Sequence, residues 1–179
     1  MSENANAVED RPADSPPKGG VDLNMRDHHW NNPPGPHEKR FNYFLVDSGW
    51  NHAVSKMVRS FFPTYFNAHT PDSLYILTPE QSMLILQRDP ELIGRDPIIL
   101  VYDLYASNHR GARGYRGFRL NLGLIRSPEQ AMARLQEFVR FIAVHRSSQH
   151  LEGEVRRELH REGIDGMVKI LREATTELL

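Results

Sequence analysis

The chain has 179 residues, 39% of them hydrophobic, and its 22 basic residues almost balance 23 acidic ones, giving a net charge of −1. This length suits one domain with flanking segments, and the charge balance argues against a protein that binds nucleic acid by charge alone. The absence of cysteine excludes disulfides, thiol nucleophiles, CxxC redox chemistry and cysteine-ligated zinc, and no apolar run approaches the ~18 residues of a membrane span. The acidic, polar N-terminus lacks a targeting pattern, so we predict a cytoplasmic protein.

Residues 1–38 are polar and rich in Pro, Asn, Asp, Gly and Glu. Proline clusters at 16–17 and 33–36 break both helix and strand, which predicts a disordered or extended arm. Trp30 is the one large aromatic residue of this arm. We expect Trp30 to anchor the arm on its own domain or, alternatively, on a partner.

A short apolar strand is predicted at 41–46, and Asp47-Ser48-Gly49 can end it and cap a long amphipathic helix. Pro63 inside this helix predicts a kink or an early end. The apolar positions of the helix share one wide face: Trp50, Ala53, Val54, Met57, Val58, Phe61, Phe62, Tyr65 and Phe66.

A second strand is predicted at 74–77, followed by a capping box at Thr78-Pro79-Glu80-Gln81 that opens a second helix. This helix should pause at Asp89-Pro90 and end at Gly94. A third strand at 97–104 is apolar enough to be central in a sheet.

A polar, glycine-rich loop at 105–117 leads to an alternating segment at 118–125, which predicts an antiparallel strand near a sheet edge, with one face buried and the other wet or covered by something polar. The buried side would hold Phe118, Leu120, Leu122 and Leu124, and the wet side Arg119, Asn121 and Gly123. Ser127-Pro128-Glu129-Gln130 repeats the cap chemistry and opens a helix that runs to about Arg146.

The C-terminal region is highly charged, with few apolar positions at 152–161 and a break at 163–166. Asp165 can then cap a last helix, whose apolar positions are Met167, Val168, Leu171, Ala174 and Leu178. The predicted organisation is therefore an arm at 1–38, an α/β domain at 39–148 and a helical tail at 149–179. The thin apolar side of the tail could lie on the domain or hold a second copy or a partner.

The order of elements over residues 41–146 is βαβαββα, which resembles the thioredoxin-like superfamily. The resemblance implies a three-layer sandwich with a mixed sheet, in which Ser48-Gly49-Trp50-Asn51-His52-Ala53 occupies the position of the redox motif without its cysteines. It also implies that Pro97, directly before the third strand, is a candidate for a cis peptide bond.

The same resemblance implies a binding pocket at the end of the sheet where the first helix begins. Its candidate residues are Ser48, Trp50, Asn51, His52 and Pro97. Backbone N–H groups at a helix start favour anions. The alternative is that Ser48 is only a helix cap and Trp50 only a core residue.

Asp47 and Asp103 follow apolar runs and suggest a different class of protein. In an all-parallel sheet both would lie at one edge, where two carboxylates could hold Mg²⁺ for a nuclease or another phosphoryl-transfer enzyme. The stretch VDSGWN is similar to the first strand of PIN-like nucleases, which assemble several carboxylates, but no convincing third is found. A thioredoxin-like topology would send the two aspartates to opposite ends, where capping is their expected role.

The segment 108–119 is the best local candidate for an interaction site, because arginine, glycine and an aromatic ring together can grip phosphate or stack on RNA bases. Its candidate residues are Arg110, Arg113, Tyr115, Arg116 and Arg119. A solvated hairpin tip is the alternative, as is contact with an acidic protein face. The nine histidines show no metal-binding spacing, and we expect neither a metal nor a cofactor.

The leading hypothesis is a non-redox protein-interaction or assembly module that could serve as a subunit of a larger complex. A protein partner or a homo-oligomer is expected, and nucleic-acid binding is a weaker alternative. Enzyme activity is not the leading expectation.

Overall fold

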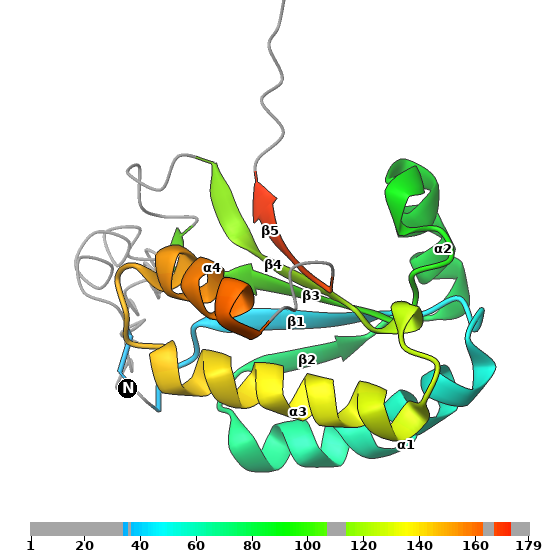
Figure 1. Cartoon of the computed structure of the whole chain (residues 1–179), viewed down its shortest axis with the longest axis horizontal. Coiled ribbons are helices and arrows are strands. Elements are labelled where there is room, and N and C mark those ends of the chain that lie inside the picture. The colour runs from blue at the N-terminus through cyan, green and yellow to red at the C-terminus, as the bar shows by residue number, and fades with distance from the viewer. Residues whose placement is uncertain (1–33, 36, 107–113, 163–166, 173–179) are drawn as a thin grey trace, which may run out of the picture.

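The structure, a computed structural model, describes residues 34–35, 37–106, 114–162 and 167–172. This part of the chain is a mixed α/β fold in which helices cover a five-stranded mixed sheet (Figure 1). Trp30 and nearly all of the predicted arm lie outside the described residues. No helix of the described ranges is long and apolar enough to cross a membrane.

The sheet has the order β2-β1-β3-β4-β5, in which only β1 and β2 are parallel. The strands are β1 (Phe41–Val46), β2 (Ser73–Ile76), β3 (Ile98–Asp103), β4 (Tyr115–Asn121) and β5 (Val168–Arg172). The helices are α1 (His52–His69), α2 (Pro79–Arg88), α3 (Pro128–His145) and α4 (Leu151–Glu162), with short 3-10 helices η2 (Pro90–Leu92) and η4 (Leu122–Leu124). The helices and strands predicted up to residue 146 are thus present, but the fourth strand spans Tyr115–Asn121 and not 118–125, and Leu122–Leu124 form a 3-10 helix in place of its predicted end.

Local capping chemistry explains where the helices begin. Thr78 and Gln81 form the predicted capping box of α2, and Ser127 accepts a hydrogen bond from the Gln130 N–H at the start of α3. The cap of α1 is Asn51, not the predicted Asp47–Gly49 segment. Helix α1 also continues through Pro63, because the burial of residues on both sides of it outweighs one missing backbone hydrogen bond.

The two faces of the sheet are covered differently. On one face α1, α3 and α4 pack over β1, β3, β4 and β5 and form the main core, in which Phe62, Leu135 and Val155 are buried. On the other face α2 and η2 cover only one end, where Leu86 and Leu92 pack against Val46, Ile98 and Leu100. Figure 1 shows this asymmetry, with α2 standing over one end of the strands.

The polar face of β4 is covered and not wet, which is the second of the two predicted arrangements. Arg119 is 4% exposed and Asn121 is fully buried. Arg119 donates to Asp89 at 3.1 Å, at the end of α2, so a buried guanidinium pairs with a partly exposed carboxylate. Strand β4 is next to the edge strand β5, which pairs with its other side.

The described part of the predicted last helix is a strand, while its predicted cap Asp165 and its positions Ala174 and Leu178 lie outside the described residues. Residues Val168–Arg172 form β5, antiparallel to β4, and Val168 enters the main core opposite Leu120. The free hydrogen-bonding groups of β4 supply a partner that a strand can use and a helix cannot. The predicted charged helix is confirmed as α4, and its apolar residues Leu151 and Val155 lie on the domain.

Candidate functional site

Three loops meet at the end of the sheet where α1 begins, at the right in Figure 1. We call them the three-loop edge: residues 47–51, 93–97 and 122–126. The N–H and the hydroxyl of Ser48 both donate to an Asp96 carboxylate oxygen. The Asn51 side chain donates to the Ile125 carbonyl at 3.1 Å, and the Gly123 N–H donates to the Arg95 carbonyl at 3.0 Å. Direct hydrogen bonds therefore hold the three loops to one another.

Asp47 anchors the first of these loops from below. Its side chain is 1% exposed and forms an ion pair with Arg59 of α1 at 2.5 Å. The same carboxylate accepts from the Ser55 hydroxyl at 2.7 Å and from the Gly49 N–H at 2.9 Å. Asp47 thus fixes the loop to the helix that follows it through side chains of α1, although it is not the cap of that helix.

Four of the predicted pocket residues are placed as follows. Ser48 donates to the side chain of Asp96, the residue directly before Pro97, and the peptide bond between Asp96 and Pro97 is cis. Asn51 caps α1 and spans to the third loop, while His52 is exposed at the first position of the helix. The pocket residues are thus brought to one edge, but Ser48 bonds to protein and is not the cap of α1.

The electrostatics of this edge do not favour an anion. The buried carboxylates of Asp47 and Asp96 already lie at the start of α1 and accept the nearby donors. A third negative group there would meet like charge. The predicted anion preference of this helix start is therefore unsupported.

Each of the three loops instead exposes one large apolar side chain. Trp50 is 75% exposed, Ile93 is 65% exposed and Leu124 is 50% exposed. The alternative that Trp50 is only a core residue is therefore wrong. Sequence reasoning missed Ile93 and assigned Leu124 to the buried side of a strand, because an apolar residue alone does not indicate on which side of a loop it will lie.

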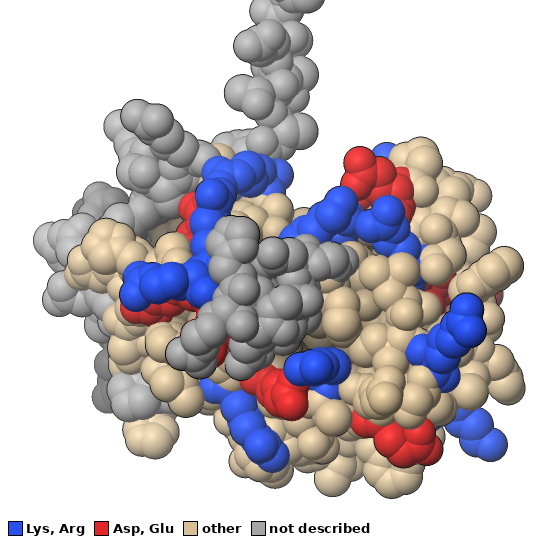
Figure 2. All heavy atoms as spheres, viewed as in Figure 1, with Lys and Arg blue, Asp and Glu red and all other residues tan. Residues whose placement is uncertain are grey.

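The arginine-glycine segment is placed only in part. Arg110 and Arg113 lie outside the described residues. Tyr115 is 5% exposed and Arg119 4% exposed, so both belong to the interior. Arg116 is half-buried and has an interaction partner. On the face of the molecule in Figure 2, the Lys and Arg side chains of the described residues are scattered, and acidic side chains lie beside several of them.

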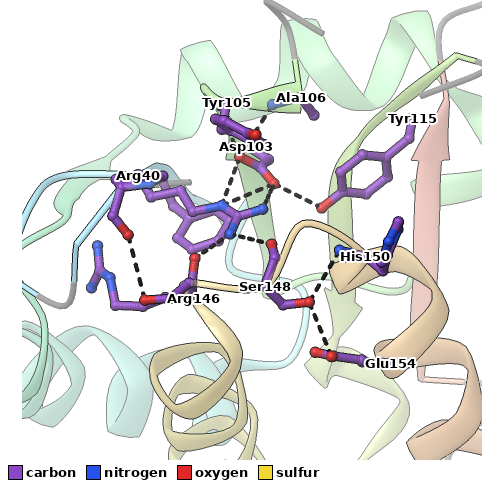
Figure 3. A network of polar contacts seen from close by, with 12 residues as sticks. Arg40, Asp103, Tyr105, Ala106, Tyr115, Arg146, Ser148, His150 and Glu154 are labelled. Carbon is purple, nitrogen blue, oxygen red and sulfur yellow. Dashed lines mark hydrogen bonds and ion pairs between the residues drawn. The ribbon is translucent and has the colours of Figure 1, made fainter. Parts of the chain in front are cut away.

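A second polar cluster lies at the opposite end of the sheet and is buried (Figure 3). The Arg40 guanidinium, 2% exposed, forms a forked ion pair with Asp103, with its Nη2 at 2.7 Å from Oδ2. Its Nη1 donates to the carbonyls of Arg146 and Ser148, just after α3. Arg40 therefore ties the start of β1 to the end of β3 and to the connection between α3 and α4.

Asp103 satisfies its remaining capacity within the same cluster. The N–H groups of Tyr105 and Ala106 donate to it at 3.0 and 3.3 Å, and the Tyr115 hydroxyl donates at 3.3 Å. Burial, aided by the negative charge of Asp103, raises the pKa of Tyr115 far above its usual value, so its hydroxyl stays protonated. With Arg40 and Asp103 closed off from solvent, the cluster acts as a structural clamp.

No sequence signal announced this clamp. Arg40 stands just before an apolar strand and Arg146 at the end of an amphipathic helix, positions where a solvated arginine is ordinary. Arg146 is nevertheless 3% exposed and pairs with Asp72 at 3.0 Å. Only the tertiary arrangement brings these charges together.

The geometry does not support a metal shared by Asp47 and Asp103. Antiparallel pairing sets Phe41 opposite Asp103 and Val46 opposite Ile98, so the two aspartates lie at opposite ends of the strands. Their separation is on the order of 20 Å at ~3.4 Å per residue. Within the described ranges, no three His, Asp or Glu side chains gather in a way that could hold a metal ion.

No protein-family model matches this chain, and neither the curated proteins nor the solved structures compared with it give a match.

Proposed function

We propose that this chain is a non-redox, thioredoxin-like protein-interaction or assembly module, a subunit that binds a partner protein through the three-loop edge. The strand order and the position of α1 and α3 on one face with α2 on the other support the thioredoxin-like assignment. Residues 48–53 occupy the position of the redox motif and contain no cysteine. This position is therefore available for binding and not for thiol chemistry.

The observation that carries the proposal is the exposure of Trp50, Ile93 and Leu124 on three loops that hydrogen bonds join. A large aromatic residue held on a rigid loop loses little entropy on binding, and tryptophan is enriched among residues that dominate protein interfaces. The buried Asp47 and Asp96 anchors hold the loop in place before any partner arrives. The edge thus combines apolar contacts with a fixed backbone.

The test is site-specific photo-crosslinking of the full chain in extract of its own cells. A photoreactive residue replaces Trp50 or Leu124 in two variants, and Val144, 78% exposed on α3, in a matched control. We expect one set of protein adducts at positions 50 and 124, retained at moderate salt and absent at position 144. Equal labelling at all three positions, or no adducts at 50 and 124, would refute a partner-binding edge.

The two other functional hypotheses lack a supporting observation. RNA binding through the 108–119 segment was predicted from its arginines. One of them, Arg119, is buried and forms ion pairs with Asp89 and Glu91. Phosphoryl transfer rested on a pair of carboxylates that the strand register separates. We therefore propose neither.

A further inference from the structure

Strand β2 forms one margin of the sheet. Among the described strands it pairs with β1 alone. The Leu77 N–H, just past the strand, bonds to the Leu45 carbonyl of β1 at 3.1 Å. Because successive peptide groups of a strand point to opposite sides, the N–H and C=O groups of Leu74 and Ile76 point away from β1.

This margin lacks the features that protect most edge strands. The sequence of β2 is SLYI, with no charge and no proline. The neighbouring Asp72 is turned inward, where its side chain, 1% exposed, pairs with Arg146. Natural edge strands usually carry charge, proline or a bulge that prevents pairing with another chain, although the shortness of β2 is itself a limit on pairing.

The opposite margin of the sheet provides the contrast. Strand β5 carries Lys169 and Arg172, which are 44% and 43% exposed and form ion pairs with Glu91 and Glu152. A second copy that paired with β5 would bring these like charges near their own counterparts. The two edge strands therefore differ as expected if charge prevents β5 from pairing with another chain while β2 pairs with one.

Large apolar side chains flank the β2 edge on both faces of the sheet. Tyr75 is 44% exposed and stacks on Phe44 at 4.9 Å, and Phe44 meets the Tyr102 ring at 5.7 Å. The three rings form a row across β2, β1 and β3, and this row stops at the margin. Ile76, on the other face, is also 44% exposed.

We propose that β2 pairs antiparallel with the β2 of a second copy of this chain, which joins two sheets into one continuous sheet. An interface between identical copies must be complementary to itself, and an uncharged strand places no like charges opposite each other. Two-fold pairing sets Leu74 opposite Ile76 of the second copy and Tyr75 opposite its own counterpart, which brings the two aromatic rows together. The partner is therefore a second copy, and the surface is separate from the three-loop edge.

The test measures molecular mass and backbone protection in the full chain. Sedimentation equilibrium over a concentration series should show a monomer–dimer equilibrium. Ile76→Lys adds a charge at the edge and should weaken the dimer by about tenfold or more. Val144→Lys adds the same charge on the exposed side of α3 and should leave the dimer intact.

Hydrogen exchange adds a readout specific to the proposed pairing. The amides of Leu74 and Ile76 should exchange more slowly as the dimer forms, and Trp50→Ala should change neither this protection nor the mass. A wild-type chain that stays monomeric to ~1 mM overturns the proposal, as does a dimer that Ile76→Lys leaves intact or one without protection at these amides. Protection of β2 by a different protein, with no dimer, overturns it as well.

Discussion

Arg40 and Asp103 keep opposite charges in an interior where each depends on the other. Their side chains are 2% and 0% exposed, so removing one charge leaves the other buried without a counter-charge. A broken buried pair is costly even where the intact pair contributes little net stability. The clamp therefore makes the fold sensitive to single substitutions at these two positions.

Asp103→Asn is the first prediction at this scale. The Arg40 charge would remain buried without a counter-charge, and we expect the free energy of unfolding to fall by about 3–5 kcal/mol. Urea denaturation measures this change. The matched control is Glu137→Gln, in the exposed Arg134–Glu137 pair, which should change stability little. A small effect for Asp103→Asn would show that the clamp is not closed to water.

Two buried tyrosines predict a loss of stability at alkaline pH. Burial raises the pKa of Tyr43 and of Tyr115 well above the usual ~10. Above pH ~10 the unfolded chain therefore releases protons that the folded chain retains, and each tyrosine lowers the free energy of unfolding by about 1.4 kcal/mol per pH unit. The contribution is complete below pH ~10 and is lost as pH rises.

The measurement is urea denaturation from pH ~9 to pH ~11.5. Tyr115→Phe removes one of the two groups, so the decline of its unfolding free energy with pH should be shallower than that of the wild type by about 1.4 kcal/mol per pH unit. Equal slopes for the two proteins would contradict the assigned shift.

At the scale of elements, the sequence predicted those features that depend on interactions between residues close together in the chain. The capping box at Thr78 was predictable because neighbours in sequence determine it. The apolar face of α1 was predictable only in part: Val54, Val58, Phe62 and Phe66 are buried, but Ala53 and Phe61 are exposed. Strand β5 was not predictable, since Val168 and Leu171 fit helical spacing as well as an extended segment with β-branched residues. The unpaired side of β4 decided between them, and pairing over such a sequence separation leaves no local signature.

The three-loop edge shows the same division. The resemblance to thioredoxin-like proteins brought Ser48, Asn51 and Pro97 to one place, and they lie there. Which side chains face out was not predictable, because Trp50 and Leu124 satisfy apolar periodicity whether buried or exposed. Burial depends on what the neighbouring loops cover, and that is known only from the folded chain.

Two glycines provide a prediction about how these elements fit together. A Cβ at Gly123 would lie 2.2 Å from the Asp96 carbonyl oxygen, so Gly123→Ala must separate η4 from the loop that carries Pro97. We expect a loss of about 1–3 kcal/mol in thermal or urea unfolding. Gly153→Ala is the control, because it lies in α4 with open space around it, and it should stabilise the helix by up to about 1 kcal/mol. A neutral Gly123→Ala would mean that the loops are not closely joined.

At the scale of the whole molecule, the segment predicted as a tail contributes to the domain. Leu151, Val155 and Val168 are buried in the main core, and Arg40 donates to the Ser148 carbonyl. Both α4 and β5 therefore contact the segment 39–148, which was predicted as the α/β domain. Such contacts favour one cooperative unit over a domain with an appendage.

Deletion of residues 149–179 tests which description holds. The three buried side chains contribute about 1.5–3 kcal/mol each, a sum comparable to the 5–15 kcal/mol that stabilises a typical domain. We therefore expect the shortened chain to lose its cooperative thermal transition and its near-ultraviolet circular dichroism. Val155→Ala in the full chain is the milder variant, expected to lower stability by about 2 kcal/mol while keeping a single transition. A shortened chain that unfolds cooperatively at the wild-type temperature would contradict this prediction, because it would place the folding information within residues 39–148.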